Sequence, residues 1–161
     1  MNWQQVVADP NLKDLPYKIE LNEWGQIVMT PARLIHGRHQ AMITALLRQL
    51  MQQVGEVVTG CAVQTDQGTK VADVAWFSLA RWHQVQDELE ASIAPEICVE
   101  IISPGHSTGE MKHKRKIYFE AGASEVWICD AKGKVKFYNQ AGEMNVSALV
   151  PAFPKNITAA V

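Results

Sequence analysis

The chain has 161 residues, 47% of them apolar and 20% charged, and carries a formal net charge of −2. These values are ordinary for one globular domain, here residues 1–161. The sequence pI of about 6.2 excludes a surface that is basic throughout. Because phosphate neutralisation by Lys and Arg dominates nucleic-acid affinity, any such contact must come from a local patch.

Cysteine usage and the N-terminal sequence exclude several other classes of protein. Cys61, Cys98 and Cys129 are far apart and follow no CxxC spacing, so we expect neither a disulfide framework nor a zinc ribbon. The first residues do not combine a basic segment with an apolar one, and no apolar run nears the ~20 residues that span a bilayer. We therefore expect a cytoplasmic protein with no membrane partner.

Apolar periodicity and turn residues predict an α/β (α+β) chain. In chain order the elements are a short helix over 2–8, strands over 17–21 and 26–29, a helix over 39–54, strands over 57–64 and 70–77, a short helix or loop over 79–90, a strand over 96–102, a helix over 108–121, strands over 125–130 and 135–138, and an edge strand over 145–150. Asn22 and Gly25 make the first two strands an N-terminal β-hairpin. The order of the remaining elements predicts a mixed β-sheet flanked by helices.

Two carboxylates stand where the pattern predicts buried strands. Glu100 interrupts the apolar run Ile97–Ile102, and Asp73 interrupts Val71–Phe77. Removing an unpaired ion from water is costly, so each residue needs a partner or a ligand. Glu100 could be bonded to a loop or paired with a lysine, and Asp73 could cap a turn at the start of its strand. Two anomalies in neighbouring elements nevertheless favour a functional site.

The helix that is predicted to follow carries a lysine on its apolar face. At about 100° per residue, Lys114 shares one arc with Met111, Ile117 and Tyr118, whereas its basic neighbours point elsewhere. Pairing with Glu110, one turn earlier, would make Lys114 an ordinary snorkelling lysine. Pairing with a buried carboxylate would make it part of the same site.

The order Asp73, Glu100, Lys114 resembles that of the PD-(D/E)XK nuclease superfamily. The chain is more closely similar to the Uma-type "putative restriction endonuclease" family, over most of its length and most strongly over 71–138. The matching segments are Ile19-Glu20-Leu21, Arg38-His39-Gln40, Ala72-Asp73-Val74, Val99–Pro104, Glu110–Lys114 and Tyr118–Asp130.

The chain departs from the family pattern at three positions. Ala72 replaces the proline before the aspartate, Gly105 replaces the second serine of a Ser-Pro-Ser turn, and Glu110 replaces an aspartate. None of these changes removes a charged group. They do alter the loop after Glu100, so the substrate preference stays open.

The resemblance implies a restriction-endonuclease-like fold and a metal-dependent endonuclease that hydrolyses phosphodiester bonds, with DNA as the expected substrate. Asp73 and Glu100 would bind Mg²⁺ or Mn²⁺, ions that prefer oxygen ligands. Lys114 would orient the attacking water or stabilise the developing charge. Glu20 would supply a further ligand or hold Lys114 in place.

Other residues are weaker candidates within the same resemblance. His39 and Glu110 would support the site, although His39 could simply lie near the start of its helix. Lys112, Arg115 and Lys116 would contact substrate phosphates, or form a solvated charged face. A homodimer would suit the cleavage of two strands.

Two further readings stay open. A catalytically silent nuclease fold, acting as a binding or assembly module, would keep the polar residues as a structural network, and the acidic pI motivates this alternative. Hydrolysis of another phosphorylated substrate is the second, because fold alone does not fix function. A zinc site at His36 and His39 is disfavoured, because no Cys or acidic partner stands at a recognised spacing.

Overall fold

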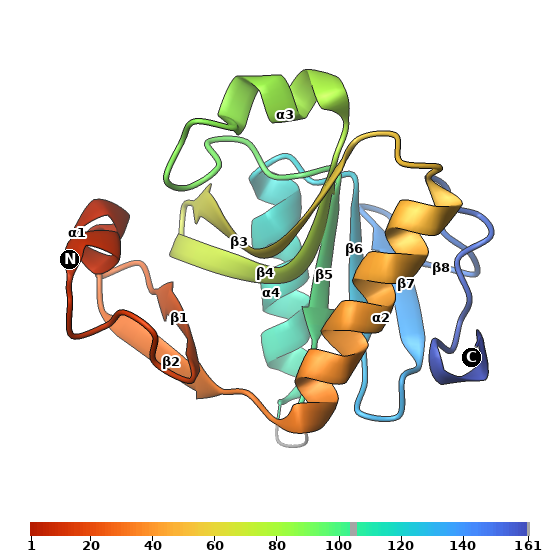
Figure 1. Ribbon diagram of the computed structural model, residues 1–161, viewed down its shortest axis with the longest axis horizontal. Coiled ribbons are helices and arrows are strands. Elements are labelled where there is room, and N and C mark those ends of the chain that lie inside the picture. The colour runs from red at the N-terminus through yellow and green to blue at the C-terminus, as the bar shows by residue number, and fades with distance from the viewer. Residues whose placement is uncertain (104–105, 161) are drawn as a thin grey trace.

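Across residues 1–103 and 106–160, the part of the chain that the computed structural model describes, a mixed β-sheet lies between two helical layers (Figure 1). In chain order the elements are α1 (Trp3–Ala8), β1 (Tyr17–Leu21), β2 (Ile27–Pro31), α2 (Leu34–Leu50), β3 (Glu56–Thr65), β4 (Gly68–Phe77), α3 (Leu79–Val85), β5 (Ile97–Ile101), α4 (Thr108–Glu120), β6 (Glu125–Cys129), β7 (Val135–Asn139), β8 (Gly142–Met144) and the 3₁₀ turn η1 (Thr158–Ala160). Within these residues the larger sheet has the order β3-β4-β5-β6-β7-β8, and only β5 and β6 run parallel. The predicted mixed sheet flanked by helices is confirmed.

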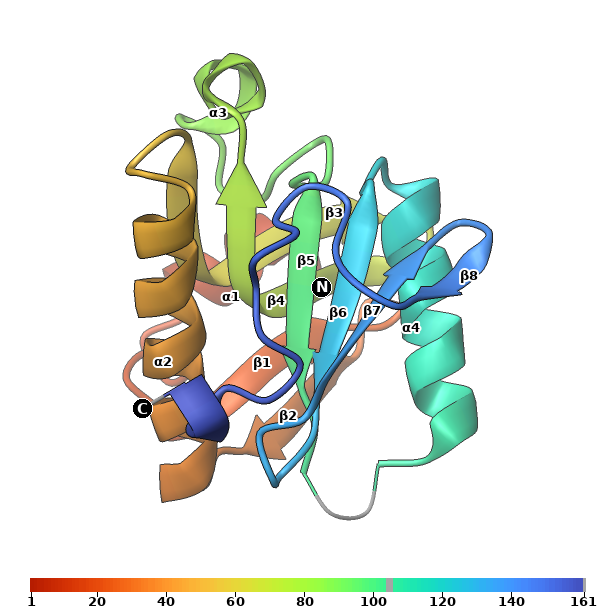
Figure 2. The ribbon, with the colours of Figure 1, turned by 90° about the vertical axis from the view of Figure 1, so that its right-hand side faces the viewer.

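The two faces of this sheet are covered by different helices (Figure 2). Ile43 and Leu47 of α2 belong to the core that contains Val99 of β5, together with aromatic residues of the C-terminal half. Tyr118 of α4 belongs to the opposite core, with Cys98 of β5. Because side chains alternate along a strand, Glu100 lies on the α4 face of β5.

The unit β5–α4–β6 supplies Glu100 and Lys114 to the candidate site. Parallel strands need a long crossover connection, and α4 provides it. The helix begins after Ser107, whose hydroxyl accepts the Glu110 N–H at 3.0 Å, a standard N-cap. β5 is buried along its whole length, and the inward face of α4 reaches Glu100 through the Tyr118 hydroxyl.

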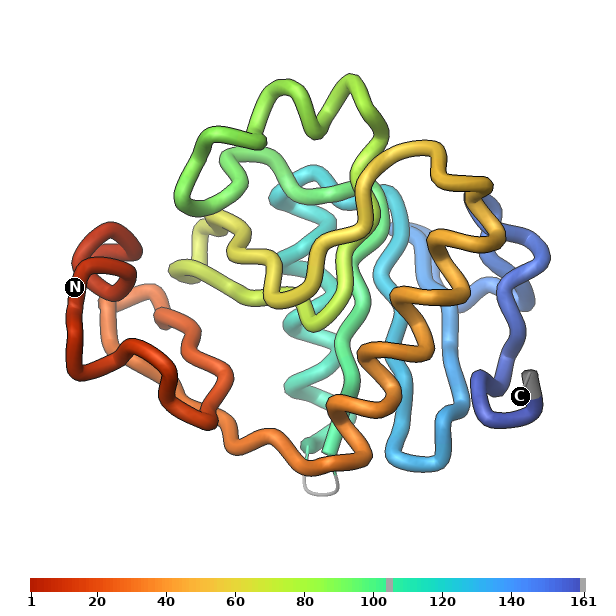
Figure 3. The backbone as a smooth tube through the Cα atoms, in the orientation of Figure 1, coloured from red at the N-terminus to blue at the C-terminus, as the bar shows by residue number. Residues whose placement is uncertain are grey.

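The hairpin β1–β2 forms a separate two-stranded sheet and leads into α2 (Figures 1 and 3). Its register pairs Lys18 with Thr30 and Glu20 with Val28, so these four residues share one face. Glu20 ties this face to β4 by accepting the Val71 N–H at 2.7 Å.

A close backbone approach holds the hairpin turn against β4. Gly68 has a φ of +85°, and a Cβ at that position would lie 2.3 Å from the carbonyl oxygen of Asn22. A larger residue would therefore push the turn away. Lys70 adds a hydrogen bond of 3.0 Å to the Leu21 carbonyl.

One predicted helix has wrong boundaries, and one predicted strand is not formed. The helix α2 covers Leu34–Leu50 instead of 39–54. Its start was predicted too late because its first turns are exposed and carry no apolar stripe or capping side chain; Leu34 is 97% exposed. The expected edge strand over 145–150 is not formed; its N–H groups turn toward Glu125, and the edge strand is β8.

The predicted turn residues Pro104 and Gly105 lie outside the described residues. Over residues 1–103 and 106–160, no helix has both the length and the apolarity to cross a membrane.

Candidate active site

A cavity of about 310 Å³ lies between the hairpin, the middle of the sheet and the N-terminal half of α4. Its ionisable lining residues are Lys18, Glu20, Glu23, His36, Lys70, Asp73, Glu100, His106, Glu110, His113 and Lys114. The cavity therefore gathers the three predicted catalytic residues, which are far apart in sequence.

Asp73 and Glu100 meet where β4 and β5 separate. The ladder between these strands runs from Trp76–Ile97 to Val74–Val99 and stops there. In place of a backbone pair, Asp73 Oδ2 accepts the Ile101 N–H at 2.7 Å. Both carboxylates are nearly fully buried, and the strand separation opens the sheet beside them.

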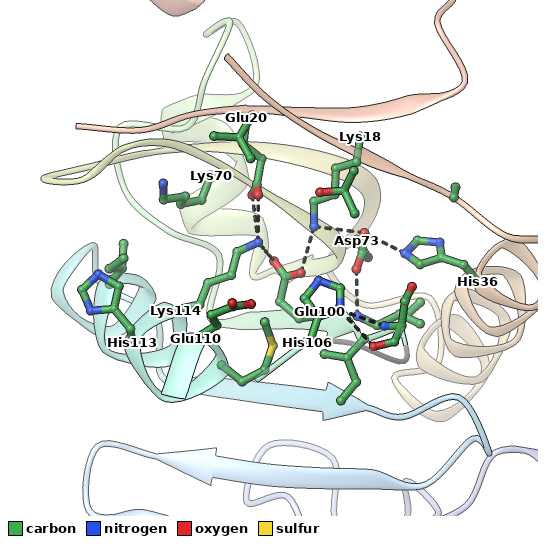
Figure 4. A pocket seen from close by; sticks show the side chains of 18 of the residues that line it. Lys18, Glu20, His36, Lys70, Asp73, Glu100, His106, Glu110, His113 and Lys114 are labelled. Atoms are coloured by element: carbon green, nitrogen blue, oxygen red, sulfur yellow. Dashed lines mark hydrogen bonds and ion pairs between the residues drawn. The ribbon is translucent and has the colours of Figure 1, made fainter. Parts of the chain in front are cut away.

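The ammonium group of Lys18 lies between these two carboxylates (Figure 4). Its Nζ is 3.2 Å from Asp73 Oδ1 and 2.8 Å from Glu100 Oε2. Sequence reasoning missed Lys18. The only available signal was its position two residues before Glu20, on the same face of one strand.

Lys114 joins the second pair of carboxylates. Its Nζ is 2.9 Å from Glu20 Oε2 and 3.1 Å from Glu100 Oε1 (Figure 4). One turn further along α4, the buried Tyr118 hydroxyl donates to Glu100 Oε1 at 2.6 Å. Lys114 thus lies on the inward face of α4, as predicted, and contacts Glu20 and Glu100 instead of Glu110.

The pKa directions follow from burial and from the two lysines. Burial acts to raise the pKa of Asp73, but the Lys18 charge and hydrogen bonds from His36 and the Ile101 N–H hold it well below its usual range. Burial likewise lowers the pKa of Lys18, but Glu100 and Asp73 together raise it above its usual range. Lys18 is therefore a permanent cation at neutral pH.

Glu20 and Glu100 shift in opposite directions. Lys114 and Lys18 hold the pKa of Glu20 below its usual range, against its burial. For Glu100, burial prevails over the same two lysines and raises the pKa. Of Glu20, Asp73 and Glu100, Glu100 is thus the most readily protonated as the pH falls.

The donor set fits a hard divalent cation. Oxygens of Asp73 and Glu100 converge on one point that already holds a positive charge, the Lys18 ammonium. Among residues 1–103 and 106–160, no three His, Cys, Asp or Glu side chains gather so as to hold a metal ion. Two carboxylates are sufficient for Mg²⁺, which commonly keeps several waters and binds substrate phosphates.

Of the two predicted supporting residues, Glu110 lies at the cavity and His39 does not. His39 is buried, does not line the cavity and has no hydrogen-bond partner within the described part of the chain. Instead His36, one turn earlier, places Nε2 3.3 Å from Asp73 Oδ1. Glu110 does line the cavity, on the exposed first turn of α4.

The three predicted phosphate contacts lie on the far side of α4. Lys112, Arg115 and Lys116 line a separate surface hollow beside β7 and β8. The Arg115 guanidinium lies 3.8 Å from the centre of the Tyr138 ring. The structure therefore does not bring these residues to the cavity that holds Asp73.

The cysteines are buried and take no part in this site. Burial raises the pKa of Cys61 and of Cys129 to about 12, so both are thiols at neutral pH. Neither is an activated nucleophile.

Comparisons with known proteins place this fold among the restriction-endonuclease-like proteins. The family model Uma2, described as "Putative restriction endonuclease", matches residues 10–156. The chain belongs to this family, and the resemblance predicted from sequence is confirmed.

A solved structure agrees with the fold. The crystal structure of a putative nuclease belonging to DUF820, from Anabaena variabilis ATCC 29413, is similar with a TM-score of 0.74 and 17% sequence identity. The match covers 98% of this chain and 96% of that one. No curated protein matches the chain.

Proposed function

We propose that the chain is a Mg²⁺- or Mn²⁺-dependent endonuclease that hydrolyses phosphodiester bonds, with DNA as its substrate in the cytoplasm. One observation carries this proposal: carboxylate oxygens of Asp73 and Glu100 converge on a single cationic point, beside Lys114, in an open cavity. The family match supports the class of reaction.

The charge balance of the site supports a divalent cation and an anionic substrate. When ionised, the carboxylates of Glu20, Asp73 and Glu100 outnumber the ammonium groups of Lys18 and Lys114 by one. A divalent cation would change this excess negative charge into an excess positive charge of the same size. A phosphodiester carries one negative charge, so it would then neutralise the cluster.

Asp73 and Glu100 would hold the cation, which supplies polarisation of a phosphoryl oxygen and a lowered pKa for a bound water. Lys114 is held between Glu20 and Glu100, so its ammonium stays at the cavity wall and can donate to the attacking water or to a phosphate oxygen. Tyr118 fixes Glu100 from the buried side and leaves its second oxygen toward Lys18.

Substrate beyond the scissile bond would reach the outer face of α4. Lys112, Arg115 and Lys116 would contact phosphates there, and a second copy of the chain would be needed to cut both strands of a duplex at once. Each lost phosphate contact should lower the dependence of binding on salt concentration by about one unit of log–log slope.

Cleavage of plasmid DNA in Mg²⁺ or Mn²⁺ tests the proposal. Asp73→Asn, Glu100→Gln and Lys114→Met should each lower the rate by about 10²–10³-fold, the cost of removing one pre-organised polar group. The exposed Asp87→Asn and Lys132→Met are matched control variants that lie outside the cavity. Cleavage at the parental rate by the three site variants would contradict the assignment.

The silent-module alternative also has an observation in its favour. Lys18 forms ion pairs with both Asp73 and Glu100, as a structural lysine would. If the protein is such a module, calorimetry should detect no heat of Mn²⁺ binding, the parent should not cleave plasmid DNA, and Glu100→Ala should change only the stability. Metal-dependent cleavage that Glu100→Ala abolishes would exclude this alternative.

A further inference from the structure

We infer that Lys18 is an internal cation that occupies the metal position in the metal-free protein and is displaced when the metal binds. This inference rests on the proposed metal site. Asp73 and Glu100 would then have two states, one bound to Lys18 and one bound to the metal. Lys18 would compete directly with the metal for both carboxylates.

The Lys18 ammonium and a metal ion would occupy the same position between Asp73 and Glu100. Lys18 Nζ contacts Asp73 Oδ1 at 3.2 Å and Glu100 Oε2 at 2.8 Å, so one ammonium uses an oxygen of each carboxylate. Mg²⁺ binds carboxylate oxygens at about 2.0–2.1 Å, closer than an ammonium does. An ion held by both oxygens and an ammonium held by both oxygens therefore require the same space.

Leaving the position between Asp73 and Glu100 without a cation would be energetically unfavourable. Asp73 and Glu100 are each 3% exposed and would repel one another if neither Lys18 nor a metal lay between them. Lys18 removes that repulsion, which allows the apo site to fold with both carboxylates in place. The site is thus prepared for a cation before the cation arrives.

The Lys18 side chain can move away from the two carboxylates while its strand, β1, stays folded. β1 has three other attachments to the body: Glu20 to the Val71 N–H, Glu20 to Lys114, and the Leu21 carbonyl to Lys70. The flexible stem of Lys18 lies in the wall of the cavity, so its ammonium can swing into open space. There it would meet the phosphate of a bound substrate.

Lys114 provides the matched comparison. It is also a cation in contact with Glu100, but it uses Oε1 and the neighbouring Glu20 and does not contact Asp73. Removing either lysine deletes one positive charge near the metal position. Only removal of Lys18 also empties that position.

Mn²⁺ calorimetry on the full chain distinguishes competition from simple charge repulsion. Lys18→Met should bind Mn²⁺ at least about tenfold more tightly than the parent, and Lys114→Met at most about threefold more tightly. Lys70→Met controls for a cavity lysine that contacts neither Asp73 nor Glu100. Equal gains in Lys18→Met and Lys114→Met, or no gain in Lys18→Met, would overturn the inference and leave the proposed function standing.

A measurement on the parent protein covers the case in which Lys18→Met does not fold. Lysine ammonium resonances, recorded by NMR during a Mg²⁺ titration, should show the Lys18 signal lose its ion-paired shift while the Lys114 signal keeps it. Binding detected by calorimetry with an unchanged Lys18 signal would overturn the inference alone. No metal binding in the parent or in any variant would overturn both the inference and the proposed metal site.

Discussion

Two neighbouring strands each bury a glutamate, and they satisfy it in opposite ways. Glu125 of β6 accepts hydrogen bonds from the Trp127 indole at 2.8 Å, the Ser147 hydroxyl at 2.6 Å, and the N–H groups of Ala148 at 2.8 Å and Leu149 at 3.0 Å. All four donors are neutral, and two belong to the backbone. The carboxylate cannot change partners unless the segment after β8 moves.

Glu100 of β5 has two charged partners with flexible side chains, and one neutral partner. Lys18, Lys114 and the Tyr118 hydroxyl contact its two oxygens, and both lysines come from elements that line a cavity. Long ammonium side chains can move away while their backbones stay in place. The comparison teaches that burial alone does not identify a functional carboxylate; its partners must also be exchangeable for a ligand.

The largest expected effect is a loss of stability when the structural glutamate, Glu125, is removed. Glu125→Ala should lower the free energy of unfolding by about 3–5 kcal/mol, because it leaves buried donors without an acceptor. Mn²⁺ affinity should stay within twofold of the parent. Urea unfolding and calorimetry measure the two quantities.

A matched control separates this effect from the loss of any glutamate. Glu143→Ala removes an exposed carboxylate from β8 and should leave both quantities unchanged. Loss of metal affinity in a folded Glu125→Ala protein would mean that the two carboxylate clusters are coupled, which would end the comparison.

The two clusters also differ in how far the sequence reveals them. Asp73, Glu100 and Lys114 were predictable as one site because each breaks a strong apolar pattern. Glu125 begins its strand, where a charged residue is unremarkable in sequence. Its role depends on residues about twenty positions later, which only the folded chain brings near.

Lys18 was missed for a similar physical reason. In Tyr17–Leu21 the polar residues alternate as they do on any half-exposed strand, which indicates a solvent-facing side. That side faces Asp73 and Glu100 only because the hairpin docks on β4. His36 was missed because the exposed first turns of α2 hide the true start of the helix.

The next largest effect is the decrease in the free energy of unfolding at acid pH that results from protonation of Asp73. The pKa of Asp73 is lower in the folded protein than its ordinary value of 3.8, so its pairing stabilises the folded state above pH 3.8 and is lost as the pH falls. We expect a loss of about 1.5–3 kcal/mol, the value of a hydrogen bond to a charged group. Urea unfolding at pH 5 and at pH 2 measures it, because a carboxylate that is protonated only in the unfolded protein changes the free energy of unfolding by about 1.4 kcal/mol per pH unit below 3.8.

The same measurement on Asp73→Asn isolates this contribution. The variant should lose less stability than the parent between the two pH values, because its amide does not titrate. Glu100 acts with the opposite sign, since its raised pKa makes protonation favour the folded state. An acid limb in Asp73→Asn as steep as that of the parent would show that other carboxylates cause it.

The smallest expected effect comes from removing the neutral partner of Glu100, the Tyr118 hydroxyl, while its two lysine partners stay in place. Tyr118→Phe removes a single neutral donor from Glu100 Oε1, which keeps its contact with Lys114. Because no oxygen is left without a partner, the free energy of unfolding should fall by only about 0.5–1.5 kcal/mol, the net value of an ordinary hydrogen bond. Urea unfolding checks this value against the larger loss in Glu125→Ala. A loss as large as that of Glu125→Ala would show that Glu100 depends on its one neutral donor as strongly as Glu125 depends on its four. The charged partners of Glu100 would then not distinguish it from a structural glutamate.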